Sequence, residues 1–597
     1  MSFHPNDVVR RGRAATVIVC GVLVFLLSAF FRAQVVKNQD YTLQSEQNRL
    51  REIPTPAPRG RILDRNNKPI AENVVGYSVA LLSQREDTLR STLNRLRTTI
   101  NLTDRQFEDA IKRFRRDPTR PTVIVPDASF DVVSVLEEHR TDFPSLIIQS
   151  APKRIYPDGQ AVGPISGYIG EITEKELGNL TSEGYKPGQQ IGKSGLEKQY
   201  ESLLRGREGV QFVEVDARNR IVQSGNAREA ITPQEGPPLY TNIDLDLQEY
   251  IHTLFGDTIS GAAVAIVPQT GEVRALYSSP AIDPNRWIGG VPASYYDSLR
   301  NDPRKPLLNW AVQTAQPPGS TFKLATSVMG LEDSLITVDS RMPEPCNGYY
   351  YMGNRAWHCW KKEGHGSLNL AGAIAQSCDV YFYQLGQKLA LSRLIGGGVA
   401  LGFDKKTGID LPEENRPIFP PANFTAYFNQ KYPKGWSGGA MELNLAIGQG
   451  ENSQTVVSMA RFYSALATDG TLPVPMIKHG APQRGLHIPL SPETFAALRT
   501  AMMGVVREGG TAAGAAIAGM NVAGKTGTAQ TMRYDKNGKP LYYAWFAGMA
   551  PAENPQIVVV VMVPNVTFEG STSAGFATKI MAHYLHKQVL NTIENTG

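Results

Sequence analysis

The sequence has little net charge, no repeated segments and only one long apolar run. Its 61 basic and 56 acidic residues leave a formal charge of +5 over 597 residues. Because such a balance creates no strong field for an acidic polymer, we expect no nucleic-acid partner. The lack of a fixed-period repeat argues against a solenoid or a propeller. The remaining composition, 41% hydrophobic and 20% charged, is ordinary for a globular protein, and the length predicts two or three domains.

The apolar run lies near the amino terminus. Residues 14–31 carry no charge and are long enough to cross a bilayer as a helix. A cleaved signal peptide would have a shorter apolar region ending at small residues, whereas two phenylalanines and Arg32 end this one. Three arginines between positions 10 and 13 place the short tail inside the cell. We therefore predict a cytoplasmic tail at 1–13, an uncleaved single-pass helix at 14–32 in the cytoplasmic (inner) membrane, and a periplasmic catalytic part.

Two changes in composition divide the rest of the chain. A charged stretch from Leu43 to Leu50 has a helical pattern, and prolines at 54, 56 and 58 end it. Short apolar runs then alternate with charged, helix-like stretches, which predicts an elongated, mixed α/β pedestal over 33–238 with an inserted head around 75–190. Beyond a proline-rich segment, the residues 239–597 are sufficient for a large α/β core, where we expect catalysis.

A serine and a lysine are spaced for nucleophilic catalysis in that region. Ser320 follows a Pro-Pro-Gly segment, opens an apolar helical run and stands one turn before Lys323. A serine hydroxyl needs a base to remove its proton, and a lysine in a partly desolvated, cationic pocket can have its pKa lowered enough to do so. The helix amino terminus would stabilise the developing negative charge. The S-x-x-K pattern is common by chance, and Ser150 to Lys153 also matches it.

Two further motifs follow in order along the chain. A Ser-Cys-Asp motif at 377–379 lies in a second helical segment, and a Lys-Thr-Gly-Thr motif at 525–528 follows a strand-like run. Together with S-x-x-K, this ordered set resembles the penicillin-binding proteins and the serine β-lactamases. A second Lys-Thr-Gly begins at Lys406 but runs into Asp-Leu-Pro instead of a strand, so we prefer the motif at 525–528.

The resemblance implies a role for each motif residue. Ser320 would be the acylated nucleophile and Lys323 its general base. Ser377 would relay a proton, and Lys525 would place a cation near that serine and the substrate carboxylate. Three residues would bind the extended substrate or complete the oxyanion hole with the backbone N–H of Ser320: Thr526, Gly527 and Thr528.

One residue departs from the wider superfamily, which usually has asparagine where this chain has Asp379. An ionised carboxylate can only accept hydrogen bonds, so the change alters the site. This S-x-D variant resembles the elongation-type penicillin-binding protein 2 subgroup of the class B penicillin-binding proteins. The segments at 58–65, 192–197, 446–450 and 545–548 also resemble class B motifs. The resemblance implies an α+β multidomain chain with a dimerisation-like pedestal and a β-lactamase-like transpeptidase domain, whose central antiparallel sheet is flanked by helices.

The function implied by the resemblance is peptidoglycan D,D-transpeptidation. Stem peptides would be cross-linked through an acyl-serine during cell elongation and rod-shape maintenance, without a catalytic cofactor, and β-lactam antibiotics would be ligands. Implied partners are a SEDS-family glycosyltransferase and a rod-shape scaffold protein.

Four alternatives remain open at this point. A D,D-carboxypeptidase or a β-lactamase would release the acyl group to water, but no clear deacylating glutamate motif is present. A division-specific transpeptidase is a close relative. A membrane-bound β-lactam sensor would carry several membrane spans and a cytoplasmic effector domain.

Three of the four cysteines lie in one stretch together with a histidine: Cys346, Cys359, His365 and Cys378. A Cys3His set suits tetrahedral Zn2+ in a closed, structural site, and some elongation-type relatives resemble this chain in carrying ligand-type residues here. Outside the cell membrane, Cys346 and Cys359 could instead form a disulfide. We expect zinc, because three cysteines are an odd number for disulfides. A constraint on Cys378 would orient its two catalytic neighbours. His358 is expected to be a surface residue.

Overall fold

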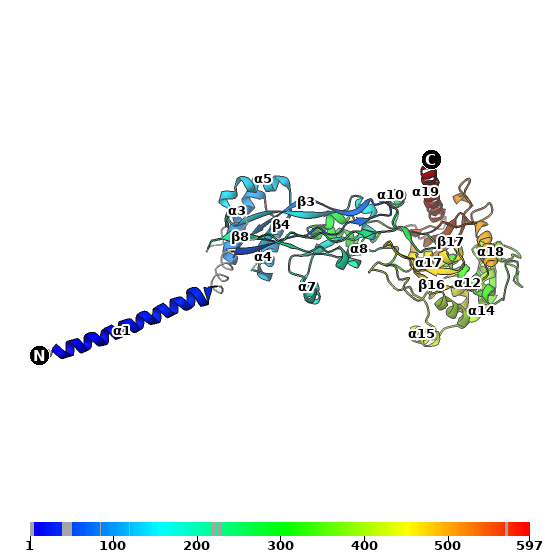
Figure 1. The fold of residues 1–597 in the computed structure, drawn as a ribbon. Coiled ribbons are helices and arrows are strands. Elements are labelled where there is room, and N and C mark those ends of the chain that lie inside the picture. The colour runs from blue at the N-terminus through cyan, green and yellow to red at the C-terminus, as the bar shows by residue number, and fades with distance from the viewer. Residues whose placement is uncertain are drawn as a thin grey trace.

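An apolar helix, a long pedestal and a larger carboxy-terminal domain follow one another along the molecule (Figure 1). The computed structural model describes residues 5–38, 50–83, 85–118, 120–216, 221–223, 229–567 and 571–596. Helix α1, Pro5–Phe31, continues into the short π-helix η1, Arg32–Val36. Within the described ranges, Val9–Val36 is the one helix long and apolar enough to span a membrane, and none of its strongly apolar window is buried. An apolar helix is therefore present where the membrane span was predicted, and it extends beyond both predicted ends.

The pedestal is built around one long strand. Its elements, in chain order, are β1 (Leu50–Thr55), β2 (Ile62–Leu63), β3 (Pro69–Leu81), α3 (Glu86–Ile100), α4 (Asp104–Arg116), β4 (Thr122–Ala128), α5 (Phe130–Glu138), β5 (Leu146–Ile155), α6 (Gly163–Ser166), β6 (Ile169–Glu171), α7 (Glu174–Leu180), β7 (Gln190–Gly192), α8 (Gly195–Gln199), α9 (Glu201–Leu204), β8 (Gly209–Val215) and β9 (Ile221–Gln223). Strand β3 pairs antiparallel with both β4 and β5. Leu89, Leu93 and Leu96 of α3 recur at helical spacing and are fully buried in the head. Helices α3 and α4 correspond to the charged, helix-like stretches expected in this region.

One local prediction for the pedestal is wrong. Leu50 begins strand β1, which includes Pro54 and pairs antiparallel with β8. The expected helix at 43–49 lies outside the described residues. The strand forms because its partner is supplied by a segment about 160 positions later in the chain, which a local pattern does not reveal.

A buried network of charged residues connects the beginning of the pedestal, at Arg59, with its later part, at Glu197. The Arg59 and Arg154 guanidinium groups donate to the Glu197 carboxylate at 2.8 and 2.7 Å, and Tyr156 donates to it at 3.3 Å. Burial would raise the pKa of Glu197, but the two guanidinium groups outweigh it and hold the pKa below its usual value. Nearby, β10 (Leu239–Tyr240) pairs parallel with β2, so the start of the large domain is hydrogen-bonded to the pedestal.

The carboxy-terminal domain contains a five-stranded antiparallel sheet in the order β12-β11-β19-β18-β17. Its main elements are α10 (Leu245–Phe255), β11 (Gly261–Ile266), β12 (Val273–Ser279), α11 (Ala293–Asn301), η6 (Gly319–Phe322), α12 (Lys323–Glu332), β13 (Tyr349–Met352), β14 (Arg355–His358), α13 (Leu370–Ala375), α14 (Asp379–Ala400), α15 (Phe424–Lys431), α16 (Gly438–Ala446), α17 (Val456–Ala467), β15 (Thr471–Pro473), β16 (Arg484–His487), α18 (Pro492–Met503), β17 (Ala523–Tyr534), β18 (Pro540–Ala550), β19 (Ile557–Val566) and α19 (Ser571–Thr596). The α/β core expected in this region is therefore present.

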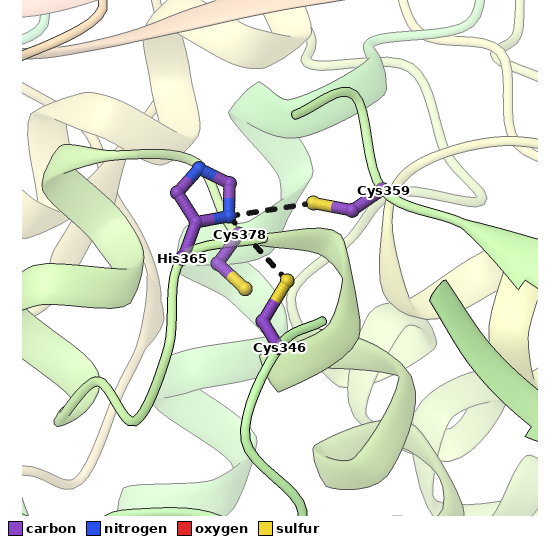
Figure 2. A group of neighbouring side chains, drawn as sticks. All are labelled: Cys346, Cys359, His365 and Cys378. Carbon is purple, nitrogen blue, oxygen red and sulfur yellow. Dashed lines mark hydrogen bonds between the residues drawn. The ribbon is translucent and has the colours of Figure 1, made fainter. Parts of the chain in front are cut away.

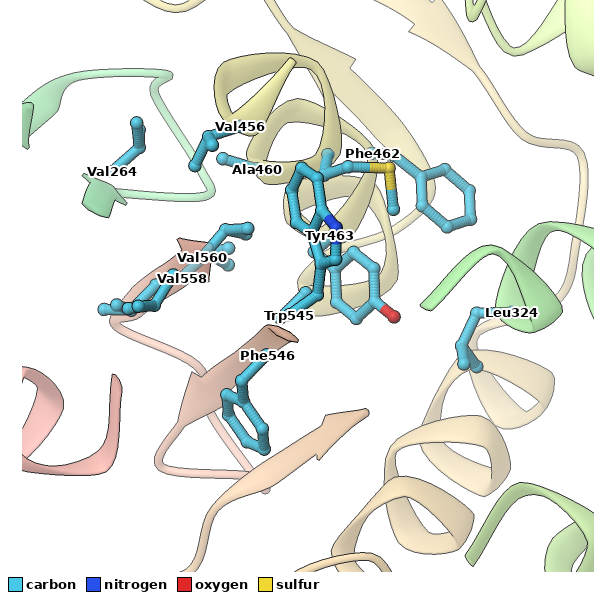
Figure 3. Packing of buried hydrophobic residues seen from close by; sticks show 14 of the residues in the cluster. Val264, Leu324, Val456, Ala460, Phe462, Tyr463, Trp545, Phe546, Val558 and Val560 are labelled. Atoms are coloured by element: carbon cyan, nitrogen blue, oxygen red, sulfur yellow. The ribbon is translucent and has the colours of Figure 1, made fainter. Parts of the chain in front are cut away.

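Helices cover both faces of this sheet. Every residue of α17 is buried, and Figure 3 shows its Tyr463 and Ala460 beside Trp545, Val558 and Val560 of the sheet. Helices α10 and α19 cover the opposite face. Because successive strand residues point to opposite faces, a strand segment covered on both sides is apolar throughout, as the buried residues 557–563 of β19 are. Strand β17 is left at the edge of the sheet, next to η6.

Candidate active site

Ser320 lies at the start of the helical segment formed by η6 and α12. Gly319, at φ +53°, donates its backbone N–H to the Gly448 carbonyl at 3.0 Å, and the Thr321 carbonyl accepts from the buried Tyr463 hydroxyl at 2.9 Å. These contacts fix the backbone on both sides of Ser320. Its own side chain is half-buried, and the hydroxyl has no hydrogen-bond partner among the described residues. The backbone that carries the oxygen is therefore fixed, and the hydroxyl itself is not hydrogen-bonded to another described protein group.

Lys323, three residues after Ser320, is fully buried and contacts the second motif. Its Nζ donates to Asp379 Oδ1 at 2.7 Å, to the Ser377 carbonyl at 3.0 Å and to Ser377 Oγ at 3.3 Å. It also lies 5.4 Å from the centre of the Phe382 ring. All three ammonium protons thus have acceptors, which a buried cation requires.

The second motif stands at a break between two helices. We expected one continuous helical segment, but α13 ends at Ala375 and α14 begins at Asp379. Ser377 lies between them at φ +55°, a left-handed conformation that is costly for a serine and that tertiary contacts must maintain. The break turns both the carbonyl and the hydroxyl of Ser377 toward Lys323.

Asp379 occupies the first turn of α14, where a carboxylate interacts favourably with the helix dipole. Its second oxygen, Oδ2, accepts the backbone N–H of Trp360 at 3.2 Å. Burial raises the pKa of Asp379, and the adjacent Lys323 ammonium opposes that shift. The residue that departs from the superfamily pattern is therefore the ion-pair partner of the predicted base.

The third motif lies on the edge strand β17. Lys525 is fully buried, and its Nζ donates to the Thr526 carbonyl at 3.2 Å. Burial and the nearby Lys323 cation lower the pKa of Lys525 well below its usual value. A Cβ atom at Gly527 would lie 2.6 Å from the Pro318 carbonyl oxygen, so only glycine lets β17 run this close to η6. A Cβ at Gly319 would similarly lie 3.0 Å from the Thr528 carbonyl oxygen.

One residue of this site was not predicted. The Thr511 hydroxyl lies 2.7 Å from the Thr526 hydroxyl and so fixes the orientation of the threonine in the third motif. Thr511 follows two glycines in a loop after α18. This glycine pair was the only local signal, and it does not indicate which distant strand the threonine meets.

The two competing motifs, Ser150 to Lys153 and the Lys-Thr-Gly that begins at Lys406, lie in different local environments. Ser150 and Lys153 lie in strand β5, where Lys153 pairs with Asp127 at 2.6 Å. Thr407 is buried in a loop and donates to the Glu414 carboxylate from both its N–H and its hydroxyl. Among the described residues, the contacts just named for these two motifs involve Asp127 and Glu414 and none of the predicted catalytic residues.

The three clustered cysteines and the histidine converge beside the second motif, as Figure 2 shows. One ligand atom from each of Cys346, Cys359, His365 and Cys378 lies within 4.8 Å of the others. His365 Nδ1 lies 3.6 Å from Cys346 Sγ and 3.5 Å from Cys359 Sγ. All three cysteines are free thiols, so the alternative Cys346–Cys359 disulfide is not formed. His358 is exposed and outside the cluster, as expected.

The donor set fits a soft or borderline divalent metal ion. A hydrogen bond from Cys378 lowers the pKa of Cys359 to about 2, while the same contact raises the pKa of Cys378. Of these two thiols, Cys359 is therefore the one more readily deprotonated to the thiolate that binds metal. His365 Nε2 is buried without a partner. The cluster also touches the catalytic residues, because the Asp379 backbone N–H donates to Cys359 Sγ at 3.4 Å.

Comparisons with known proteins agree with this geometry. Residues 261–582 match the family model of the penicillin binding protein transpeptidase domain, and residues 54–241 match that of the penicillin-binding protein dimerisation domain. Peptidoglycan D,D-transpeptidase MrdA of Haemophilus influenzae is 31% identical over 610 residues, which cover 97% of this chain and 92% of that protein.

Two solved structures are similar over almost their whole length. The complex between penicillin-binding protein PBP2 and MreC from Helicobacter pylori contains a chain with a TM-score of 0.77 and 26% identity, covering 90% of this chain and 99% of that one. A structure described as showing structural coordination of polymerization and crosslinking by a peptidoglycan synthase complex contains a chain with a TM-score of 0.69 and 28% identity. The match covers 96% of this chain and 98% of that one.

Proposed function

Because the chain belongs to the penicillin-binding protein transpeptidase family, we propose that Ser320 is the nucleophile with which it cross-links peptidoglycan. The chain is a D,D-transpeptidase of the elongation type. It acts on peptidoglycan stem peptides, and β-lactams bind it as they bind the family. The observation that carries the residue assignment is the contact of the buried Lys323 with both Ser377 and Asp379, one helical turn from Ser320.

The first half-reaction forms the acyl-enzyme. Lys323, in its neutral amine form, accepts the Ser320 proton as the oxygen attacks the carbonyl carbon between the two terminal D-Ala residues of the donor stem. The peptide C–N bond breaks, and Ser377 passes a proton to the departing D-Ala amine while it regains one from the Lys323 ammonium. Backbone N–H groups of Ser320 and Thr528 stabilise the oxyanion, a contribution of about 3 kcal/mol per donor in comparable sites.

The second half-reaction transfers the acyl group. An amine of a neighbouring stem attacks the ester carbonyl, the bond to Ser320 breaks, and the serine oxygen recovers a proton while the new amide forms. Lys525 and Thr526 hold the substrate carboxylate, and the extended donor strand lies along the edge of β17. The free edge of that strand supports this orientation, because an edge strand offers unpaired backbone groups to an extended peptide.

Intact-mass measurement after incubation with benzylpenicillin tests the nucleophile. The wild-type chain should gain one acyl adduct, and Ser320→Ala should gain none. Ser150→Ala, which removes the serine of the competing motif, is the matched control and should keep the adduct. An adduct retained by Ser320→Ala would overturn the assignment.

The cysteine cluster is proposed to bind a structural Zn2+ ion. Cys346, Cys359, His365 and Cys378 would hold it, and it would supply no chemistry to the reaction, since four protein ligands close the site. Their convergence and the buried, free thiols support the proposal. Elemental analysis of chain purified without added metal should give about one zinc per chain. A Cys346–Cys359 bridge detected by peptide mass spectrometry, with no stoichiometric zinc, would replace zinc with a disulfide.

The chain organisation and its partners are proposed as follows. The tail at 1–13 is cytoplasmic, the anchor crosses the inner membrane once, and the pedestal over 33–238 carries the transpeptidase domain over 239–597 in the periplasm. The similarity to a chain in complex with MreC, and to one in a peptidoglycan synthase complex, supports a rod-shape scaffold protein and a SEDS-family glycosyltransferase as partners. Co-purification of the full-length chain with each candidate from detergent-solubilised membranes tests these partners. Alkaline phosphatase fused after residue 597 should be active if the topology is right.

A further inference from the structure

The hairpin of β13 and β14 lies next in the chain to Cys346 and Cys359 of the cysteine cluster. One of its faces packs against α14, and the other is exposed. Its inner face carries Tyr350 and Trp357, whose rings lie 6.4 and 6.0 Å from that of Tyr383 in α14. Tyr350 also donates its hydroxyl to Gln387 of the same helix at 2.5 Å. The hairpin is therefore fixed to the helix that begins at Asp379.

The outer face of the hairpin is aromatic and exposed. Tyr349 and Tyr351 are 44% and 60% exposed, and their rings contact edge to face with centroids 5.2 Å apart. His358 pairs in register with Tyr349 and is exposed on the same face. The transpeptidation mechanism uses none of these residues. Large exposed rings held on a rigid support are typical of a recognition surface.

This face is continuous with the catalytic groups. Two residues beyond His358, Trp360 is 47% exposed, donates its indole N–H to the Gln376 carbonyl at 3.1 Å, and donates its backbone N–H to Asp379. Four exposed rings therefore run from the tip of the hairpin toward Lys323: Tyr351, Tyr349, His358 and Trp360. The exposed basic side chain of Lys362 follows Trp360 by two residues, whereas Arg355 lies over the Trp357 ring on the packed face of the hairpin.

We propose that the outer face of this hairpin binds the glycan strand that carries a stem peptide, with Tyr349 and Tyr351 as the stacking platform. The proposal rests on the proposed transpeptidation at Ser320. The stem peptide is proposed to lie along the edge of β17, so the sugar chain to which it is attached must continue over a neighbouring surface. Pyranose rings present flat C–H faces that stack on tyrosine, and their hydroxyl and acetamido groups can hydrogen-bond with the tyrosine and histidine side chains. The Lys362 ammonium complements the carboxylates of peptidoglycan stems.

The test compares polymeric and small substrates with the full-length chain in detergent. We expect Tyr349→Ala combined with Tyr351→Ala to lower kcat/KM for uncross-linked peptidoglycan strands about tenfold, mainly through KM. The rates with a free stem pentapeptide and with benzylpenicillin should change less than about twofold, because neither reaches the platform. Replacing both tyrosines with phenylalanine should keep most of the strand activity, since the ring faces remain.

The matched control replaces two other exposed tyrosines, Tyr240→Ala with Tyr296→Ala, which are 49% and 41% exposed. This control variant should react with all three substrates at the wild-type rates. Unchanged strand activity in the Tyr349/Tyr351 double variant would overturn the inference. An equal loss of kcat/KM with all three substrates would show that the hairpin only supports the active site. A loss with the strands and the free pentapeptide, but not with benzylpenicillin, would show that the tyrosines bind the peptide. Either result overturns the glycan proposal. If wild-type chain failed to react with benzylpenicillin at Ser320, the proposed function would fail instead.

Discussion

The Nζ atom of Lys323 lies 2.7 Å from Oδ1 of Asp379, and the lysine is fully buried while the carboxylate is 14% exposed. The superfamily more often has a neutral amide at this position, so the elongation-type site pairs its base with an anion. The carboxylate is in turn held by the backbone N–H of Trp360. The ion pair therefore connects the catalytic lysine to the segment that contains the cysteine cluster.

Asp379→Asn is expected to slow acylation by benzylpenicillin about 10²-fold. The amide keeps the shape but removes the charge that orients the Lys323 ammonium. Stopped-flow acylation kinetics check the rate. The control is Asp333→Asn, which breaks an exposed pair with Arg393, and its rate should equal that of wild type. An unchanged rate in Asp379→Asn would show that the ion pair does not position the base.

Lys525→Met is expected to raise the free energy of unfolding by about 1 to 3 kcal/mol at pH 7 while abolishing turnover. The cause is the removal of an amine whose charged form is penalised by burial and by the nearby Lys323. Because the pKa of Lys525 is lowered in the folded chain, its charge destabilises the fold fully below that lowered pKa. The penalty fades as the pH rises from there toward the ordinary value of 10.5.

The stability advantage of Lys525→Met over wild type should therefore shrink with increasing pH. Thermal unfolding of both chains between pH 7 and pH 10 measures this difference. An advantage that stayed constant with pH would contradict a lowered pKa. The exposed Lys406→Met, from the competing motif, serves as the control and should show no pH-dependent difference.

Gly448→Ala is expected to displace the nucleophile. Gly448 has φ +73°, and a Cβ atom there would lie 2.3 Å from the Gly319 carbonyl oxygen, one residue before Ser320. Gly509→Ala is a matched control, because Gly509 has φ +82° but no atom within 4 Å of its added Cβ. Both variants carry the left-handed strain, and only the first adds the clash, which should cost a further 1 to 3 kcal/mol or so of stability. Chemical denaturation and penicillin acylation rates compare the two. Equal stabilities and equal acylation rates of the two variants would show that the backbone at Ser320 can shift to accommodate the added Cβ atom without loss of function.

Cys346→Ser is expected to release the zinc ion and lower the Tm. A serine hydroxyl is a much poorer zinc ligand than a thiolate, so the cluster loses one of its four ligands. Acylation should slow as well, because Cys359 holds the backbone N–H of Asp379. Elemental analysis and calorimetry measure the two effects, with Cys20→Ser in the membrane helix as the control. Zinc content and Tm equal to those of wild type would remove Cys346 from the ligand set.

Much of this protein follows from its sequence alone. Hydrophobic patterning predicts the membrane helix, the helices of the head and the strands of the carboxy-terminal sheet, because each of these elements repeats a local period over many residues. The motifs containing Ser320, Lys323 and Lys525 are also visible, since catalysis requires those residue types at short, fixed spacings.

Only the tertiary structure determines the remaining features, because each depends on a partner that is distant in the chain. Leu50 lies in a strand because β8 pairs with β1, against the helical pattern that precedes it. Ser377 breaks its helix and adopts a left-handed conformation because Lys323, 54 residues earlier, binds its carbonyl and hydroxyl. The partnership of Thr511 with Thr526 and the convergence of the cysteines on His365 are likewise set by the fold. Local patterns record the preferences of neighbouring residues, whereas these contacts exist only after the core has brought separate segments together.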